Sequence, residues 1–528
     1  MSDTAAGPAP VTRPQSASAA TDGPMLAADG TPLKRSLARA LRMQKIRALM
    51  LIAPLLIFVL VTFIAPIADM LFRSVENQIV QETLPETVVA LSDWDATSDT
   101  PPSEPVFEAL YIDIFLAQEQ KLHTRLGTRL NYEQTGASSL FRKSGRRVAR
   151  FDTDIYTDQI TAASPALSEP SAWVQMLDDP ATRDALPLTS RTWDRWSAYL
   201  LAQDDDPASE DVEDFLFTTL YIDLRNGAQP PDPRLSSLDV SGFETVSLTA
   251  SFEDVDEDWL DPRMWRTLQI YSPAYTSGYF LNSVDMQKSI DGPEFRPQGQ
   301  QIYLMLFQRT LIMSLIITVS CILLGYPVAW LLANLPMRTA NLLMILVLLP
   351  FWTSLLVRTS AWKVMLQQQG VINDVLVWLG LVDDAARLIM INNQLGTIIA
   401  MTHILLPFMI LPLYSVMQTI PPSYLRAAKS LGATNWTAFW RVYFPQSVPG
   451  IGAGSILVFI LAIGYYITPE IVGGTTGTFI SNRIAYHIST SLNWGLAAAL
   501  GAILLGVVLL LYWCYDRIVG IDNVKLGG

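Results

Sequence analysis

Six apolar runs, each long enough to cross a lipid bilayer, constrain what this chain can fold into. A bilayer offers peptide groups no hydrogen-bond partner, so a segment that crosses it must satisfy its own amides and carbonyls. About 20 apolar residues in an α-helix span the hydrocarbon layer. The sequence therefore predicts an all-α membrane protein with six transmembrane helices, at residues 48–72, 304–332, 340–357, 396–417, 450–466 and 494–515.

A basic cluster precedes the first run. Residues 1–47 form a polar amino-terminal region that begins with a composition typical of disorder and ends with six Lys or Arg residues after position 33. A secretory signal peptide would have a shorter apolar core, so we interpret the first run as a retained membrane helix. Positive charge favours the cytoplasmic side, where Arg338 and Arg517 also fall. Both termini, including the tail at 520–528, are therefore predicted to be cytoplasmic.

Residues 73–303 contain no run of membrane-spanning length. This segment holds 39 of the 49 Asp and Glu residues but only half of the 36 Lys and Arg residues. We predict an acidic periplasmic domain, of a fold that the sequence does not identify, inserted between the first two membrane helices. Its charge argues against a nucleic-acid partner. The sequence Leu110-Tyr111-Ile112-Asp113 recurs at Leu220-Tyr221-Ile222-Asp223, but four residues do not establish a repeat.

The sequence contains no motif for catalysis, a cofactor or a metal. Cys321 and Cys514 both lie in apolar runs, and the three histidines are too far apart in sequence to suggest ligand spacing. No phosphate-binding loop of the ATPase type occurs. We therefore predict a protein that is not an enzyme and binds no cofactor.

The most informative polar segment lies between the fourth and fifth runs, at residues 420–448. Pro421 and Pro422 favour the start of a short helix, and Gly432 favours a left-handed end to it. Thr434 is a suitable cap for a second helix. Pro445, with Pro449 beyond the segment, is expected to end that second helix before the next membrane span begins.

This segment resembles the "EAA" loop of membrane subunits of bacterial ABC importers, in which a two-helix elbow docks onto the ATPase. Arg426-Ala427-Ala428, Gly432, Val442, Phe444 and Pro445 follow the spacing of that loop, with Arg426 where the family usually has Glu. The resemblance implies a cytoplasmic coupling loop and assigns ATPase coupling to Arg426, Ala427, Ala428, Gly432, Ala433 and Pro445.

Three further motifs, at 325–329, 349–359 and 464–474, resemble the spermidine/putrescine-type permeases of this importer family. The resemblance implies a permease core at residues 304–519 with the fold of a type I ABC importer, in the bacterial inner membrane. It implies three protein partners, namely a cytoplasmic ATPase dimer, a second permease subunit and a periplasmic substrate-binding protein. Because six helices make only half of such a pathway, a dimer is required, and the resemblance favours a heterodimer.

A polyamine is a flexible multiple cation, so its pathway needs carboxylates and aromatic faces. Glu470, Tyr465, Tyr466 and Trp352 are the candidates for the substrate pathway. Trp and Tyr also gather at membrane interfaces without a role in transport, and Arg358 argues against a purely cation-selective path. Pro350, Pro407 and Pro412 lie within spans and permit kinks, in either a moving or a rigid bundle.

Other functions agree with parts of this pattern. The same importer class could carry an amino-acid derivative, a phosphonate or an iron complex. A signalling receptor would use residues 73–303 as its sensor, but the short segment after the last span leaves little room for an output domain. A fusion of sensor and permease is the remaining alternative. The main expectation is half of an importer pathway for a small polar solute, with a polyamine favoured.

Overall fold

The computed structural model describes residues 33–236 and 238–519, and these are mostly helical. The predicted terminal tails at 1–32 and 520–528 lie outside the described residues. The chain divides near Asp69 into two compact units, 1–69 and 70–528, which are described separately.

The first unit is one helical segment that continues into α2. Helix α1 (Leu33–Val59) leads through a π-helical turn at Leu60–Ile64 into α2 (Ala65–Arg73). The stretch Arg42–Arg73 is strongly apolar and none of its residues is buried, as expected for a helix surrounded by lipid. The basic segment before the predicted span is therefore helical, and the span itself agrees with the prediction.

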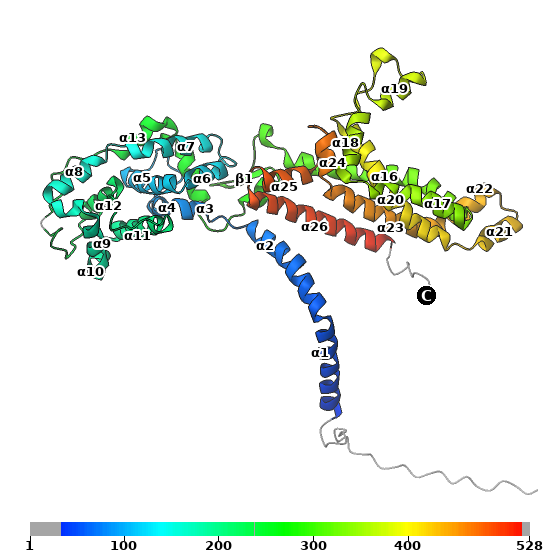
Figure 1. Ribbon diagram of the computed structural model, residues 1–528, viewed down its shortest axis with the longest axis horizontal. Helices are drawn as coiled ribbons and strands as arrows, with labels where there is room; N and C mark the ends of the chain where they lie inside the picture. The colour runs from blue at the N-terminus through cyan, green and yellow to red at the C-terminus, as the bar shows by residue number, and fades with distance from the viewer. Residues whose placement is uncertain (1–32, 237, 520–528) are drawn as a thin grey trace, which may run out of the picture. The chain divides into compact units, whose positions relative to one another are not determined.

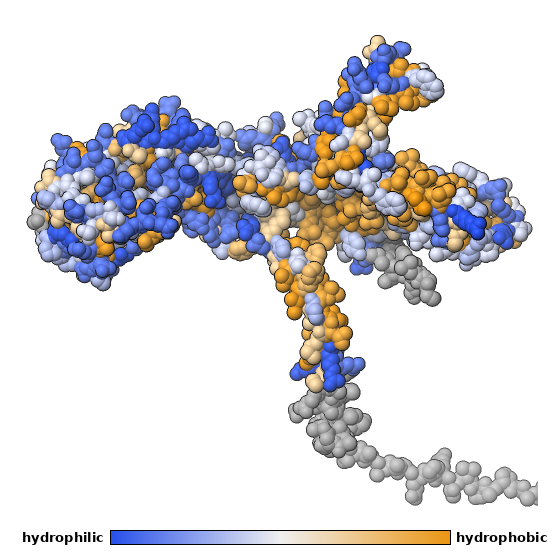
Figure 2. Space-filling view, in the orientation of Figure 1, coloured by the Kyte–Doolittle hydropathy of each residue, from blue (hydrophilic) through white to orange (hydrophobic). Residues whose placement is uncertain are grey.

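Three long helices form the centre of the membrane part: α16 (Tyr303–Asn334), α20 (Gln394–Gln418) and α23 (Phe444–Gly464). They pack against one another along their lengths (Figure 1), and residues such as Ile317, Leu405 and Val458 are fully buried between them. Helix α26 (Trp494–Val519) is the last span. Pro407 and Pro412 lie inside α20, which continues through both. Hydrophobic residues cover much of this part of the surface (Figure 2).

The predicted third span, 340–357, is not a single straight helix. Helix α17 (Met337–Leu348) ends in a 3-10 turn at Leu349–Trp352, and α18 (Leu355–Met365) leaves at 93°. Pro350 lies in that turn and has no amide hydrogen to continue an α-helix. Among the described residues, five helices are long and apolar enough to cross a membrane, and six if this bent pair counts as one span.

The prediction that Pro445 and Pro449 end the elbow's second helix is wrong. Helix α22 (Asn435–Ala438), a π-helical turn at Phe439–Tyr443 and α23 form one helical stretch. The amide of Phe444 bonds to the carbonyl of Phe439, five residues back, so the turn before Pro445 is widened. A widened turn accommodates a proline ring that would clash in a regular α-helix.

The segment at 73–303 folds as a helical domain with one small β-hairpin, and hydrophilic residues cover most of its visible surface (Figure 2). The hairpin pairs Met286–Ser289 (β1) with Gly292–Phe295 (β2). The α-helices are α3 (Ile79–Thr83), α4 (Pro85–Leu91), α5 (Glu104–Glu119), α6 (Leu122–Leu130), α7 (Ala137–Arg147), α8 (Asp154–Ala163), α9 (Pro170–Asp178), α10 (Pro180–Ala185), α11 (Pro187–Ala202), α12 (Asp214–Arg225), α13 (Leu248–Val255), α14 (Pro262–Ile270) and α15 (Gly278–Ser283). Short 3-10 turns at Val148–Arg150, Pro165–Ser168, Glu257–Leu260 and Gln298–Gln300 connect some of them.

The two Leu-Tyr-Ile-Asp sequences occupy equivalent places in this domain, on α5 and α12. The Asp113 carboxylate accepts hydrogen bonds from the Thr87 amide at 2.7 Å and hydroxyl at 2.8 Å. The Asp223 carboxylate accepts the corresponding two hydrogen bonds from Thr189, from the amide at 2.8 Å and from the hydroxyl at 2.7 Å. Both threonines lie in the first turn of a helix that begins with Leu-Pro, α4 or α11. Each aspartate thus ties its helix to the helix before it.

The equivalence extends further along the chain. The Trp173 indole on α9 donates to the carbonyl six residues earlier at 2.8 Å, and the Trp265 indole on α14 does the same at 2.7 Å. Trp173 packs edge-on against Phe217 of α12, whereas Trp265 packs edge-on against Phe107 of α5. Apart from α6 and α7, which occur only in the first copy, residues 84–178 and 186–270 therefore have the same order of helices and contacts. Each tryptophan packs against the other copy.

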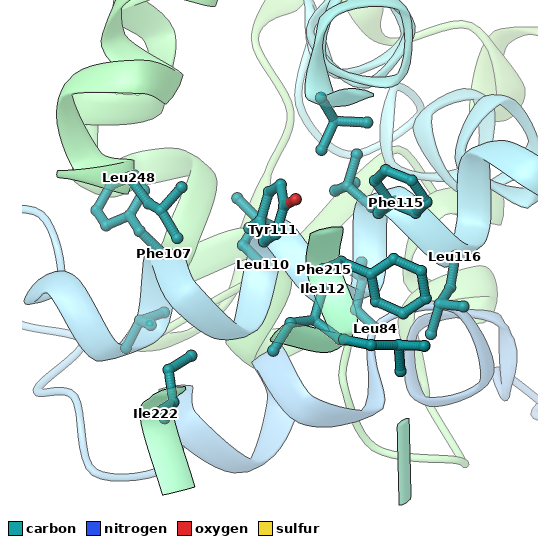
Figure 3. Close-up of a cluster of buried hydrophobic side chains, with 14 of the residues drawn as sticks. Leu84, Phe107, Leu110, Tyr111, Ile112, Phe115, Leu116, Phe215, Ile222 and Leu248 are labelled. Atoms are coloured by element: carbon teal, nitrogen blue, oxygen red, sulfur yellow. The ribbon is translucent and has the colours of Figure 1, made fainter. Parts of the chain in front are cut away.

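The shared core surrounds α5. Leu84, Leu110 and Phe215 are fully buried, and Figure 3 shows side chains from both copies meeting there. Because both copies supply side chains to this core, neither can bury its apolar face alone. The tandem repeat is therefore one cooperative domain.

The repeat makes a testable prediction about the paired threonines. Thr87→Ala and Thr189→Ala each remove a hydroxyl donor from a buried carboxylate, and burial already raises the pKa of Asp113 to about 6. We expect each change to lower the stability of the domain by about 1–3 kcal/mol. For a domain of this size, that corresponds to a fall in melting temperature of about 2–4 °C per kcal/mol.

The measurement is tryptophan fluorescence of the full-length protein during heating. Thr97→Ala is the matched control, because the Thr97 hydroxyl also donates to an aspartate, Asp95, but on an exposed loop. It should shift the melting temperature little. A fall in melting temperature for Thr87→Ala with no fall for Thr189→Ala would contradict the equivalence of the two copies.

Candidate functional site

The elbow between α20 and α23 has the local structure that the sequence predicts at its first turn. Helix α21 (Pro422–Ser430) begins after Pro421, and Gly432 has a left-handed φ of 91°. The amide of Ala433 bonds to the carbonyl of Ala428 at 3.1 Å, which closes the end of α21. The Thr434 hydroxyl then accepts the Thr437 amide at 3.2 Å and caps α22. The predicted left-handed turn and helix cap are confirmed.

The base of the elbow is fixed by aromatic side chains. Tyr326 of α16 packs edge-on against Phe439. Its hydroxyl shares a 2.9 Å hydrogen bond with the hydroxyl of Ser447. Phe439 also stacks on Tyr443, which is buried. Leu425 of α21 packs against the same core of the membrane helices. The elbow is therefore joined to α16 and α23 by packed rings.

The tip of the elbow is exposed and partly apolar. Leu431 is 89% exposed and Trp436 is 71% exposed, beside the exposed charges of Arg426 and Lys429. Ala427 is exposed, whereas Ala428 and Ala433 are partly buried. Pro445 is exposed at the start of α23. This combination of large apolar and basic side chains is typical of a surface that binds another protein.

A second group of predicted residues lies where α23 ends. The chain leaves the helix after Gly464, passes Tyr465 and Tyr466, and begins a short helix, α24 (Ile467–Val472). The Ser481 hydroxyl donates to the carbonyl of Tyr465 at 2.6 Å, and the Asn482 amide donates to the carbonyl of Tyr466 at 2.9 Å. Both donors come from α25 (Ile480–Ser489). They satisfy carbonyls that the break in the helix leaves open.

Glu470 is the acidic residue of this break. Its side chain is exposed, and one carboxylate oxygen accepts the Asn482 amide at 2.6 Å. Asn482 therefore holds both the Tyr466 carbonyl and the Glu470 carboxylate. This hydrogen bond orients the Glu470 carboxylate.

The structure brings three of the four predicted pathway residues to one element. Tyr465 and Tyr466 directly precede α24 and Glu470 lies within it, whereas Trp352 lies at the bend between α17 and α18 and is 78% exposed. Helix α18 packs against α24, where the hydroxyls of Thr359 and Thr468 are 3.2 Å apart. The two breaks in the membrane helices are thus linked through α18.

Sequence reasoning missed the residues that hold the break after α23 and the base of the elbow. Ser481 and Asn482 hold the break through hydrogen bonds, and Tyr326 holds the elbow through a ring contact with Phe439. The available signal was the presence of adjacent polar residues, Ser481 and Asn482, at the start of a helix. It does not identify their partners.

The histidines have defined neighbours. The His403 ring accepts the Trp362 indole at 3.0 Å, and His487 lies between the Tyr303 hydroxyl at 3.0 Å and the Ser491 hydroxyl at 2.8 Å. Burial and the nearby Arg483 lower the pKa of His487 to about 4, so it is neutral at pH 7. Within residues 33–236 and 238–519, no three His, Cys, Asp or Glu side chains are grouped as metal ligands would be.

These features together describe a multi-pass membrane protein, with broken helices and an exposed elbow. Residues 302–519 match the family described as "Binding-protein-dependent transport system inner membrane component". The spermidine/putrescine transport system permease protein PotB of Escherichia coli (strain K12) is 37% identical over 220 residues, covering 41% of this chain and 79% of PotB. The permease protein YdcU of the same strain is 32% identical over 260 residues, covering 46% and 82%.

The chain therefore belongs to the family of binding-protein-dependent inner-membrane transport components. It is a permease of an ABC importer and not an enzyme. Residues 73–301 lie outside the family match, so the matched region begins just before α16.

Proposed function

We propose that this permease forms half of a translocation pathway for a polyamine such as spermidine or putrescine. A second, similar permease completes the pathway as a heterodimer, a periplasmic binding protein delivers the solute, and a cytoplasmic ATPase dimer drives transport. The similarity to PotB across the membrane part supports this solute. An importer for an amino-acid derivative, a phosphonate or an iron complex is the alternative.

The observation that carries the polyamine proposal is the exposed Glu470 carboxylate beside a break in the membrane helices. A carboxylate in a low-dielectric route attracts a cation strongly. Tyr466 and Trp352 are exposed and offer aromatic faces to an ammonium group. This chemistry favours a cationic solute over an anionic one.

We propose that the elbow transmits ATPase motion to the membrane helices. Its exposed tip, with Leu431, Trp436 and Arg426, would contact the ATPase, and its base is already packed against α16. Because Arg426 stands where related permeases usually have Glu, its partner is expected to be acidic or a carbonyl. Movement at the tip then reaches α16 and α23 through rigid contacts.

Gly432→Val tests the elbow. A β-branched residue at a φ of 91° is strained by about 1–3 kcal/mol, so α21 should be displaced while the spans stay intact. We expect normal membrane insertion but loss of ATP-driven uptake and of stimulated ATP hydrolysis in the assembled importer. Gly227→Val is the matched control, since Gly227 has the same φ and equally open surroundings but lies outside the elbow. Normal uptake by the Gly432→Val importer would refute coupling.

We also propose that residues 73–303 lie in the periplasm and that both termini are cytoplasmic. Ser209 and Ser430 are exposed positions in the domain and the elbow. In intact cells, a membrane-impermeant maleimide should label Ser209→Cys but not Ser430→Cys. The native cysteines are Cys321, which is buried, and Cys514, so the parent protein measures background. Labelling of Ser209→Cys only after the inner membrane is opened would place residues 73–303 in the cytoplasm and contradict the proposed topology.

Glu470→Gln tests the solute. The neutral amide no longer offsets a cation, so we expect the KM for spermidine uptake to rise about tenfold, equivalent to about 1.4 kcal/mol. Glu294→Gln is the matched control, because Glu294 is also exposed and also accepts a side-chain amide, that of Gln287 at 2.7 Å. Unchanged spermidine uptake by the Glu470→Gln importer would remove Glu470 from the pathway and count against a polyamine.

A further inference from the structure

A cavity of about 650 Å³ opens between α6 and the start of α26, and part of the segment 73–82 also lines it. It is far larger than a water molecule, which takes about 30 Å³ in the liquid. Trp494, the first residue of the last span, lines it, and so does Arg73, the last residue of α2. Tryptophan at the end of a span is typical of the headgroup layer of a membrane.

Three residues of the lining each carry a buried polar atom that has no hydrogen-bond partner among the described residues. These atoms are Arg129 Nη2, Asn493 Nδ2 and Asn77 Oδ1, on side chains whose residues are 7%, 8% and 2% exposed. Buried polar groups are normally satisfied, so such a concentration in one cavity needs an explanation. Two of these atoms are donors and one is an acceptor.

Two nitrogens of Arg129 are held by hydrogen bonds, and the third, Nη2, has no partner among the described residues. Its Nε donates to the Tyr279 hydroxyl at 2.8 Å and its Nη1 to Glu133 at 2.6 Å. The guanidinium also lies 4.3 Å from the centre of the Tyr279 ring. Asn493 is fixed in the same way, because its Oδ1 accepts the Leu496 amide at 3.2 Å and caps α26. Both donors are therefore preorganised for a ligand.

The charge behind the cavity is unbalanced. Glu133 pairs with Arg129 and also with Arg296 at 3.0 Å, so two buried guanidinium groups share one carboxylate. The nearby Asp285 is engaged elsewhere, accepting the amides of Ile302, Tyr303 and Leu304 at the start of α16. The single carboxylate of Glu133 leaves one of the two positive charges unbalanced, so an anion at the Arg129 nitrogen would complete the charge balance of this group.

The lining also has an acceptor side. Glu76 and Glu82 join the open Asn77 oxygen on the segment after α2. A ligand that pairs with both the donor side and the acceptor side has an anionic group and an N–H donor in the same molecule. At the headgroup layer, phosphoethanolamine has this combination, whereas phosphocholine lacks the N–H groups.

We propose that this cavity binds the phosphate group of a phospholipid headgroup, with phosphatidylethanolamine as the preferred lipid. Arg129 and Asn493 hold the phosphate, and Asn77 and the two glutamates accept from the ammonium group. The bound lipid ties α6 of the intervening domain to the first turn of the last span. The site stands apart from the elbow and from Glu470 and does not depend on the transported solute.

Asn493→Asp tests the site with little structural cost. It keeps the oxygen that caps α26 but replaces the donor with an anionic oxygen that repels phosphate. Asn393→Asp is the matched control, since Asn393 caps α20 through its Oδ1, at 3.0 Å from the Gly396 amide, and does not line the cavity. Thr128→Glu, at an exposed position on the lining, is a second variant in case Asn493→Asp fails to fold.

The measurement is thermal stabilisation of the full-length protein in detergent by added phosphatidylethanolamine, phosphatidylcholine or inorganic phosphate. We expect phosphatidylethanolamine to stabilise the parent and Asn393→Asp proteins, and each cavity variant to need about tenfold more of it. Equal responses of parent and cavity variants would overturn the site. Equal stabilisation by phosphatidylcholine would overturn the ammonium contacts, and full stabilisation by inorganic phosphate would assign the site to a free ion instead of a lipid.

Discussion

The need to satisfy every backbone hydrogen bond inside a bilayer governs the membrane part of this protein. It makes the spans helical, and it limits where a helix can be interrupted. At Tyr465 and Tyr466 the chain leaves α23, and the side chains of Ser481 and Asn482 bond to the carbonyls that are set free. The same Asn482 positions Glu470. The polar residues proposed for the pathway are thus grouped where the backbone itself required polar partners.

The elbow applies a related principle at the other end of α23. A π-helical turn precedes Pro445, so α22 of the elbow and the span α23 form one continuous helical stretch. Tyr326 connects this stretch to α16 by ring packing and by its hydrogen bond to Ser447. A coupling element whose helix continues into a span can transmit motion to that span directly, whereas an element joined by a flexible linker could not. This continuity is the main physical support for a coupling role.

The intervening domain is built on a different constraint. Its two copies exchange tryptophan contacts, because neither has enough apolar surface to form a core by itself. Asp285 then caps the start of α16, and α15 packs against α26. The domain is therefore joined to two membrane helices by short contacts. The cavity beside Arg129 lies at this junction, where a lipid would strengthen the connection.

The spans, the elbow's first helix and its left-handed Gly432 could be predicted from the sequence, because they depend on local composition and on single-residue backbone preferences. The break after Leu348 and the continuous helix through Pro445 could not be predicted, because a proline permits either outcome and neighbouring packing decides. The recurring Leu-Tyr-Ile-Asp sequence was visible, but only the matching bonds of Asp113 and Asp223 show a repeat. Likewise, the sequence determined that Glu470 follows an apolar run. The tertiary structure alone decided that Asn482, from another helix, holds it, since hydrogen bonds between distant residues depend on how the helices pack.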